Sequence, residues 1–187
     1  MFKYLMFIMV LLAPLYSFSQ ESKLPNIIMM IGDGMGLSQI SSGMYSNNNY
    51  TSLERSHHIG LIKTHSFDDL VTDSAASGTA MSSGVKTYNR VVGMDVNYSP
   101  VKSILEISRD KGYMTAIIAT STIVHATPAS YYSKVKSRYD YDEIASQLSK
   151  SNINFFVGGG EKYFNDRRDK RNLMNEMDDY LLSLIHI

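Results

Sequence analysis

Cysteine is absent from the 187 residues of the chain. Without thiols the protein can form neither a disulfide framework nor a zinc site built on thiolates. A lipid anchor attached to a cysteine behind a leader peptide is excluded for the same reason. Any bound metal ion must therefore take its ligands from Asp, Glu, His, Ser or Thr.

An excess of charge of either sign is also missing, because 18 lysines and arginines balance 18 aspartates and glutamates. A nucleic-acid-binding surface needs concentrated positive charge to neutralise phosphates, so we do not expect nucleic acid as a partner. Hydrophobic residues make up 44% of the chain, which is ordinary for a globular protein and sufficient for the core of one domain.

The first twenty residues form a separate segment. Lys3 supplies a positive charge, residues 5–15 form an apolar run broken only by Pro14, and small residues stand at Ser17 and Ser19. This pattern predicts a cleavable signal peptide at residues 1–19, and hence a periplasmic or secreted protein with no stable membrane anchor after cleavage. The alternative is an uncleaved anchor, but the run is shorter than the ~20 residues that span a bilayer, and no later stretch is long enough.

Apolar strands and helices alternate after this leader. The apolar patterns predict strands, buried in the sheet, at residues 27–31, 113–119 and 153–157, and helices at residues 101–110 and 142–148. Strands that alternate with helices are typical of parallel sheets. We therefore predict an α/β fold with a mostly parallel central sheet flanked by helices, within one domain over residues 20–181.

Two stretches near the C-terminus are expected to have no functional role. Residues 165–171 are charged and are expected to face solvent. Residues 182–187 match the translation of a common sequencing-transposon end and follow a helix-like segment without a stop signal. We interpret them as adapter-encoded, so His186 is not expected to bind metal. A natural apolar C-terminal segment is the alternative.

Asp33 stands between glycines directly after the first expected strand. Ligands of parallel α/β sheets gather at the carboxyl ends of strands, and the glycines at 158–160 follow the third strand at the same edge. A carboxylate in that place suits a hard or borderline metal ion. Taken alone, an aspartate in a glycine-rich turn more often stabilises the turn itself.

Ser74 precedes a run of small residues, at positions 75–80, that can begin a tightly packed helix. Backbone N–H groups at a helix start attract phosphate, so a hydroxyl there is a candidate nucleophile for attack on phosphorus. The alternative is an ordinary N-cap serine. Because no histidine is near Ser74 in the sequence, a metal ion is the expected activator of the hydroxyl.

These motifs resemble the alkaline phosphatase family. Residues 26–36 and 73–84 closely match its two N-terminal signatures, residues 84–89 continue the match, and the likeness extends over about residues 24–164. Two such motifs in the right order, followed by further matching positions, are far more specific than an Asp-Gly pair alone.

The resemblance implies a role for each matching residue. Asp33 would bridge a zinc and the magnesium ion, and Ser74 would become phosphoserine. Arg138 would bind the phosphate, with Asp73 orienting it, and the Thr127 hydroxyl would bind magnesium. A planar guanidinium can grip two phosphoryl oxygens, and a threonine oxygen is acceptable to a hard cation. Without the resemblance, Arg138 would be taken for an exposed surface arginine.

The family reaction is the hydrolysis of phosphate monoesters to inorganic phosphate at a site with two zinc ions and one magnesium ion. Most zinc ligands and one magnesium ligand of the family come from the C-terminal half, which this chain lacks. The resemblance therefore implies an N-terminal fragment with an incomplete sheet, which we expect to be poorly folded and inactive. The full-length protein is expected to be a homodimer, as is usual among relatives.

His125 occupies a position where some family members have an aspartate next to magnesium and others a histidine. A neutral imidazole removes negative charge beside the metal, so we expect looser magnesium binding than in relatives that carry aspartate, and entry of zinc in its place. The remaining histidines, His57, His58 and His65, match no family ligand and are expected in surface loops.

Three other functions remain open at this point. A sulfatase of the same superfamily is disfavoured because Ser74 is followed by Ala-Ala-Ser and not by the proline and arginine that formylglycine formation requires. A phosphodiesterase is disfavoured because those enzymes usually use threonine as the nucleophile. A secreted, non-catalytic phosphate-binding module would keep Arg138 and the helix start for binding alone.

Overall fold

The computed structural model describes residues 25–177 and the backbone of residues 181–185. The chain divides into two units, residues 1–32 and Asp33–Ile187. Of the first unit only residues 25–32 are described, so the expected signal peptide lies outside the described residues, as does His186. Among the helices that are described, none is long and apolar enough to cross a membrane.

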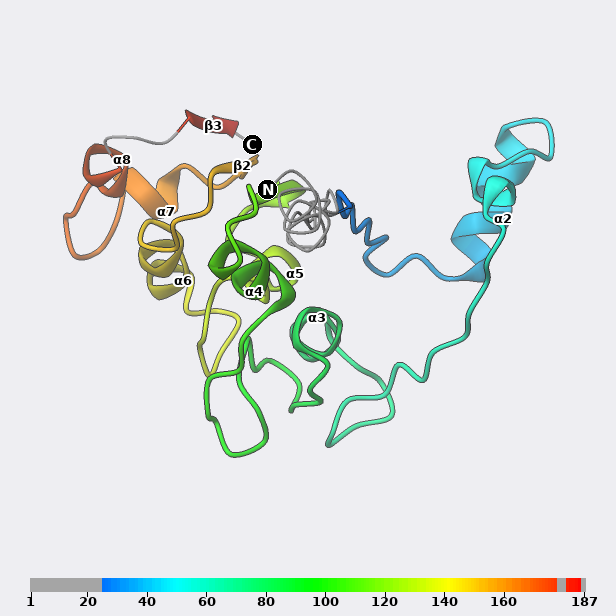
Figure 1. Ribbon diagram of the computed structural model, residues 1–187, viewed down its shortest axis with the longest axis horizontal. Coiled ribbons are helices and arrows are strands. Elements are labelled where there is room, and N and C mark those ends of the chain that lie inside the picture. The colour runs from blue at the N-terminus through cyan, green and yellow to red at the C-terminus, as the bar shows by residue number, and fades with distance from the viewer. Residues whose placement is uncertain (1–24, 178–180, 186–187) are drawn as a thin grey trace, which may run out of the picture. The chain divides into compact units, whose positions relative to one another are not determined.

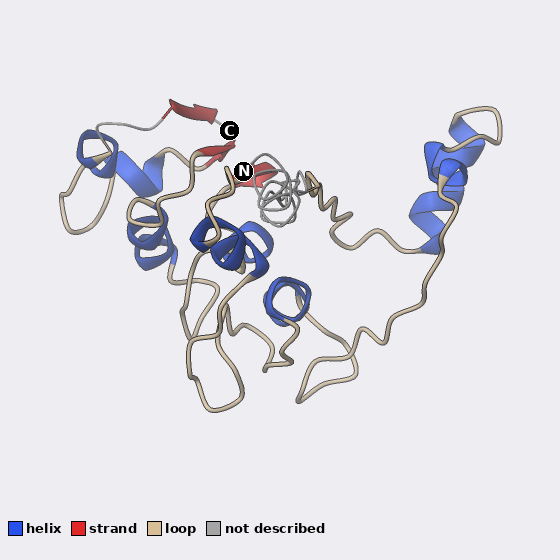
Figure 2. Cartoon of the chain, viewed as in Figure 1, coloured by secondary structure: helices blue, strands red, loops and turns tan. Residues whose placement is uncertain are grey.

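The second unit contains a parallel sheet with the strand order β1-β2-β3 (Figure 1). The strands are β1 (Ala116–Thr122), β2 (Phe155–Gly159) and β3 (Leu181–Ile185). Its helical segments are α2 (Leu37–Ser46), η2 (Ser52–Arg55), α3 (Ser74–Ser83), α4 (Ile104–Asp110), α5 (Ala126–Ala129), α6 (Tyr141–Leu148), α7 (Lys162–Asn165) and α8 (Leu173–Glu176). A parallel sheet with flanking helices confirms the α/β class (Figure 2).

Strand β1 is covered on one face only. Ile117 is buried and packs in the core with Phe156, Ile123 and Ile144, whereas the side chain of Ile118, on the opposite face, is 72% exposed. The sequence pattern suggested a strand buried in a parallel sheet. That expectation is wrong for β1, because the described helices that pack on the sheet leave its other face open. Parallel sheets normally have both faces covered.

The local patterns place most elements to within three residues. The helix expected at 101–110 begins at Ile104, because Ser103 forms a capping box: its Oγ accepts from Glu106 N, and its N–H donates to Glu106 Oε2. The strand expected at 153–157 extends through Gly158 and Gly159, and the turn begins at Gly160, whose φ of 100° favours glycine. Helix α6 agrees with its expected span.

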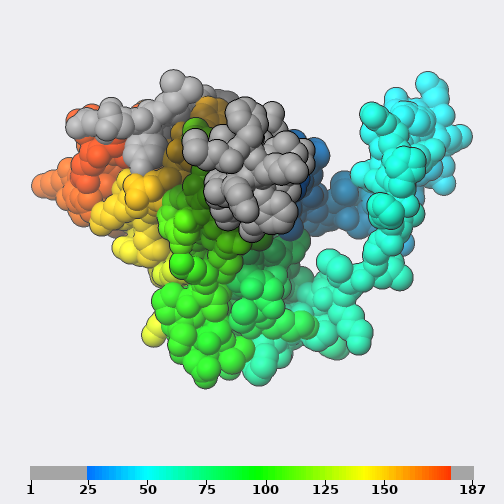
Figure 3. Space-filling model, viewed as in Figure 1, coloured from blue at the N-terminus to red at the C-terminus, as the bar shows by residue number. Residues whose placement is uncertain are grey.

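The strand expected at residues 27–31 is absent. In the first unit, residues 25–32 have no regular structure, and Ile28 and Met30 are exposed at 85% and 91%. A strand exists only by pairing its backbone with a neighbour, and apolar character alone does not supply one. Exposed apolar residues recur in the second unit at 57–65, shown in teal in Figure 3, where Leu61 is 98% exposed.

The charged stretch at 165–171 does not lie wholly in solvent. Arg167 is buried, and its guanidinium donates to the carbonyl oxygens of Asp142 and Tyr163 and to the carboxylate of Asp169. A buried guanidinium needs this number of acceptors to offset its lost hydration. Arg167 therefore ties the segment after α7 to the start of α6.

Candidate active site

Two hydroxyl groups meet at one carboxylate. The Ser74 Oγ donates to Asp33 Oδ1 at 3.0 Å, and the Thr127 Oγ1 donates to Asp33 Oδ2 at 2.8 Å. Ser74 begins α3, and Thr127 lies in α5, which follows β1 at its carboxyl end. Asp33 therefore joins Ser74 and Thr127 through its two carboxylate oxygens.

Ser74 is the first residue of α3 and is not its cap. The N-cap is Asp73, whose Oδ1 accepts from the N–H groups of Ala75 and Ala76 at 3.1 and 2.9 Å. The interpretation of Ser74 as an N-cap serine is therefore wrong, since that role belongs to the residue before it. The same bonds occupy two N–H groups at the helix start that were expected to be free for phosphate.

The capping carboxylate also holds the arginine. Asp73 Oδ2 accepts from Arg138 Nη1 at 3.1 Å and from the backbone N–H of Arg90 at 3.0 Å. Both side chains of the Arg138–Asp73 ion pair are about one-fifth exposed. Asp73 thus fixes one nitrogen of the Arg138 guanidinium, and its role in orienting that arginine for phosphate stays a prediction.

The side chain of Asn89 holds the backbone around Asp73 in place. Asn89 accepts from the backbone N–H of Asp73 through Oδ1 and donates from Nδ2 to the carbonyl oxygen of Val71. Its own N–H donates to Asp68 Oδ1. The sequence analysis included Asn89 in a matching motif but gave it no role, and it overlooked Arg90. Asn89 is the last residue of that motif, and Arg90 follows it directly.

His125 precedes α5 and lies beside the same group of residues. Its ring is tilted against that of Tyr141, with centroids 6.2 Å apart. Burial, together with the positive charge of Arg138, lowers the pKa of His125, and the carboxylate of Asp33 opposes this effect only in part. The imidazole is therefore neutral near neutral pH. His57, His58 and His65 are exposed, as expected.

Three described residues could contribute oxygen ligands to a metal site. The oxygens of Asp33, Ser74 and Thr127 converge, and such a set suits a hard cation. No group of three or more His, Asp or Glu residues that could hold a metal ion occurs within residues 25–177. Because zinc requires three or four protein ligands, the convergent oxygens fit a shared edge of a metal centre and do not form a complete zinc site.

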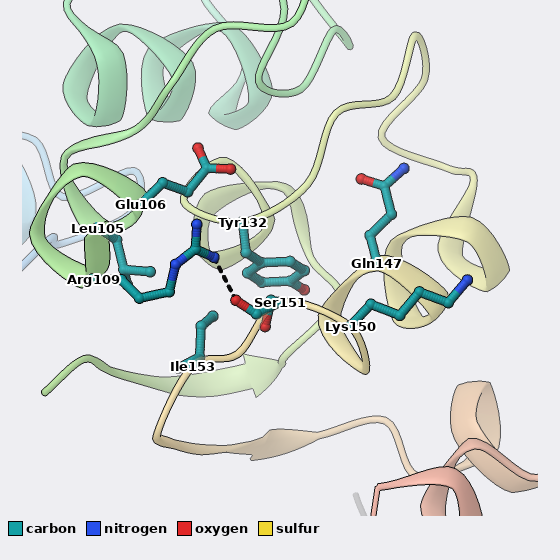
Figure 4. A pocket seen from close by; sticks show the side chains of 8 residues that line it. All are labelled: Leu105, Glu106, Arg109, Tyr132, Gln147, Lys150, Ser151 and Ile153. Atoms are coloured by element: carbon teal, nitrogen blue, oxygen red, sulfur yellow. Dashed lines mark hydrogen bonds between the residues drawn. The ribbon is translucent and has the colours of Figure 1, made fainter. Parts of the chain in front are cut away.

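A cavity of about 250 Å³ lies away from this group, between α4 and α6 (Figure 4). Its arginine, Arg109, donates from Nη1 to the carbonyl oxygen of Ser151 and from Nη2 to Asp110. Glu106, on the same wall, is paired with Lys134. The charged groups of Arg109 and Glu106 are therefore already engaged by neighbouring residues.

The chain is similar to proteins of one known family. The alkaline phosphatase family profile matches residues 24–183, so the chain belongs to the alkaline phosphatase family. It is 41% identical over 172 residues to alkaline phosphatase 4 of Bacillus subtilis (strain 168), a match that covers 83% of the chain and 37% of that protein. It is 35% identical to the repressible alkaline phosphatase of Saccharomyces cerevisiae, covering 81% of the chain and 29% of that protein.

A solved structure shows the same fold. Alkaline phosphatase from the Antarctic bacterium TAB5 superimposes with a TM-score of 0.76 at 43% identity, covering 78% of the chain and 43% of that protein. A variant of that enzyme, with a histidine replaced by aspartate, has Mg bound in its M3 site. The chain thus spans less than half the length of each of these relatives.

Proposed function

We propose that the full-length protein hydrolyses phosphate monoesters, with the Ser74 Oγ as the nucleophile. The observation that carries this proposal is the shared carboxylate of Asp33, which accepts hydrogen bonds from Ser74 and Thr127 at 3.0 and 2.8 Å. The family supports it, because the relatives that match this chain are alkaline phosphatases. The substrate class is phosphate monoesters, and one product is inorganic phosphate.

In the first step the Ser74 oxygen attacks phosphorus in line with the departing alcohol, and a phosphoserine forms. The hydrogen bond from Ser74 to Asp33 Oδ1 orients the hydroxyl towards the place where Asp33 and Ser74 would share a zinc ion, and the bound ion would lower the pKa of that hydroxyl. Water then attacks the phosphoserine, releases phosphate and restores the hydroxyl. Two successive inversions at phosphorus retain its configuration.

Arg138 positions the phosphoryl group during both steps. One of its nitrogens is held by Asp73, so the guanidinium cannot rotate freely and its remaining N–H groups can contact phosphoryl oxygens. Two backbone N–H groups at the start of α3 already donate to Asp73 and are not available to phosphate. Arg138 would therefore stabilise a larger share of the negative charge on the phosphoryl oxygens.

The expected cofactors are two zinc ions and one magnesium ion. Asp33 and Thr127 would hold the magnesium ion, Asp33 and Ser74 would contact zinc, and His125 would stand beside the magnesium site. Bound there, the metal ions would supply charge stabilisation and a lowered pKa for the attacking oxygen. The further ligands that zinc needs would come from a part of the protein outside this chain.

The 187-residue chain alone is proposed to be inactive and poorly folded. The open face of β1, with Ile118 exposed, and the exposed residues 27–30 support this, since another part of the protein would have to cover them. Purified residues 20–187 should show no zinc-dependent hydrolysis of p-nitrophenyl phosphate and no cooperative unfolding. Appreciable zinc-dependent turnover would contradict this proposal.

For the full-length protein we also propose secretion or a periplasmic location after cleavage at residue 19, and assembly as a homodimer. The activity is tested with three esters of p-nitrophenol: the phosphate monoester, the phosphate diester and the sulfate. Preferred, zinc-dependent cleavage of the monoester, abolished in Ser74→Ala, is the expected result. Preferred cleavage of the diester or the sulfate would contradict the proposal, and binding of phosphate without turnover would indicate a binding module.

A further inference from the structure

A cavity of about 500 Å³ adjoins the Asp73–Arg138 pair. Two arginines, Arg90 and Arg138, line it together with Asp68, Asp69, Asp73, Asn89 and Tyr139. Ser74 is not part of this lining. Because Arg138 lines the cavity, a second anionic group bound there would lie next to a phosphate that Arg138 holds.

The backbone at Arg90 adopts a conformation that favours glycine. Its φ is 74°, in the left-handed region, where a side chain costs free energy. Two hydrogen bonds hold it there: the Arg90 N–H donates to Asp73 Oδ2 at 3.0 Å, and the Arg90 carbonyl oxygen accepts from the Arg138 N–H at 2.8 Å. Glycine would make both bonds without the cost, so the side chain itself calls for an explanation.

The guanidinium of Arg90 is available for a ligand. Arg90 is exposed, and in the part of the chain that the structure describes it forms no ion pair. Arg138 is tied to Asp73, and Arg109 in the smaller cavity is tied to Ser151 and Asp110. Among these three arginines, only Arg90 lines a cavity with a guanidinium that has no hydrogen bond or ion pair within the described residues.

We propose that Arg90 is a specificity-determining residue that binds a second anionic group, a phosphate or a carboxylate, on the alcohol part of the substrate. The proposal rests on the proposed function, since it assumes that Ser74 attacks the first phosphate. Arg138 would hold that first phosphate, and Arg90, on the other side of Asp73 Oδ2, would hold the second group. Planar guanidinium groups bind both kinds of anion through paired hydrogen bonds.

Two carboxylates in the lining limit the strength of this preference. Asp68 Oδ1 accepts from Ser66 Oγ and from the Asn89 N–H, the second of which lowers the pKa of Asp68 and keeps it ionised. Asp69 Oδ1 accepts from the Val71 N–H. Their negative charge repels an anionic group, so the preference should be modest and should grow in Asp68→Asn, which keeps the acceptor oxygen but removes the charge.

The test compares three substrates on the metal-loaded, full-length protein: phenyl phosphate, 4-carboxyphenyl phosphate and benzene-1,4-diyl bisphosphate. The measured quantity is kcat/KM for each substrate with a second anionic group divided by kcat/KM for phenyl phosphate, with the bisphosphate corrected for its two equivalent groups. Arg90→Gly should lower this ratio about three- to tenfold at low salt, mainly through KM, and Arg90→Lys should retain most of it. In the wild-type protein, a larger ratio for the bisphosphate would identify phosphate as the preferred group, and a larger ratio for 4-carboxyphenyl phosphate would identify carboxylate.

Two controls make the result specific. Arg168→Gly removes the same charge from an exposed position outside the cavity and should leave the ratio unchanged. Arg90→Gly should raise the melting temperature, because it relieves the left-handed strain, so a fall in the ratio would not reflect unfolding. An unaltered ratio in Arg90→Gly, with phenyl phosphate still hydrolysed, would overturn the role of Arg90 alone. If the wild-type protein hydrolysed none of the three esters, both the proposed phosphatase function and the role of Arg90 would be overturned.

Discussion

Ser74 and Asp33 are 41 positions apart in the sequence, yet the Ser74 Oγ lies 3.0 Å from Asp33 Oδ1. The other oxygen of the same carboxylate receives the Thr127 hydroxyl from a third part of the chain. One aspartate therefore gathers the candidate nucleophile and a candidate magnesium ligand, and this sharing is the structural basis of the proposed phosphatase activity.

Replacing Arg138 by lysine should weaken phosphate binding. Lysine keeps the charge but loses the planar fork that contacts Asp73 and phosphate together, at a cost of about 2 kcal/mol, or roughly thirtyfold in KM. Steady-state kinetics and inhibition by inorganic phosphate measure this on the full-length protein. Arg109→Lys, the same exchange in the other cavity, is the control, and equal effects of the two variants would argue against the assigned role of Arg138.

His125→Asp should increase the affinity for magnesium about tenfold, because it places a negative charge beside the expected magnesium site. Equilibrium titration of the metal-free, full-length protein with magnesium, in the presence of zinc, measures the change. His57→Asp, at an exposed loop position, serves as the control. No gain in magnesium affinity for His125→Asp would count against the inferred position of His125.

Gly93→Ala should destabilise the full-length protein by at least about 3 kcal/mol. Gly93 has a φ of 62°, and a Cβ there would lie 2.0 Å from the carbonyl oxygen of Ser133, which is backbone and cannot swing away. Gly43 lies within α2 and has open space around it, so Gly43→Ala should instead increase the free energy of unfolding by at most about 1 kcal/mol. Denaturant unfolding compares the two variants, and similar stabilities would be inconsistent with the close approach at Gly93.

Asp169 should contribute to stability only above acidic pH. Its hydrogen bonds to Arg167 are the main cause that lowers the pKa of Asp169 from 3.8 to about 2. Because the folded-state pKa lies below the unfolded value, the contribution is complete above pH 3.8 and is lost as the pH falls toward 2. Asp169→Asn should therefore narrow its stability deficit relative to wild type over that range, as measured by urea unfolding at several pH values. A deficit independent of pH would contradict the ion pair.

The sequence predicted best what depends on neighbouring residues. Helix α6, the order of β1 and β2 and their parallel direction follow from local apolar periodicity. The start of α4 was displaced by the capping box at Ser103, which is a local signal that the apolar pattern alone does not contain. The strand expected at 27–31 failed because strand formation depends on a partner, and apolar composition does not reveal whether one is present.

The residue types and the family resemblance identified six candidate site residues. They did not show which of these residues contact one another. That Asp73 caps α3 with one oxygen while holding Arg138 with the other depends on three-dimensional geometry. Arg90 was overlooked because its significance lies in a backbone angle and an unpaired guanidinium, neither of which is visible in the sequence. Arg167 was placed in solvent because its acceptors are mainly carbonyl oxygens, which every residue has.

The central claim, that Ser74 carries the phosphoryl group, is tested most directly by acid quenching the full-length, metal-loaded protein during turnover and locating phosphate by peptide mass spectrometry. The account predicts stoichiometric phosphate on Ser74 of the wild-type protein and no bound phosphate in Ser74→Ala. The kcat/KM of that variant should be lower by roughly a thousandfold or more. Undiminished turnover by Ser74→Ala, or phosphate on a different residue during wild-type turnover, would contradict it.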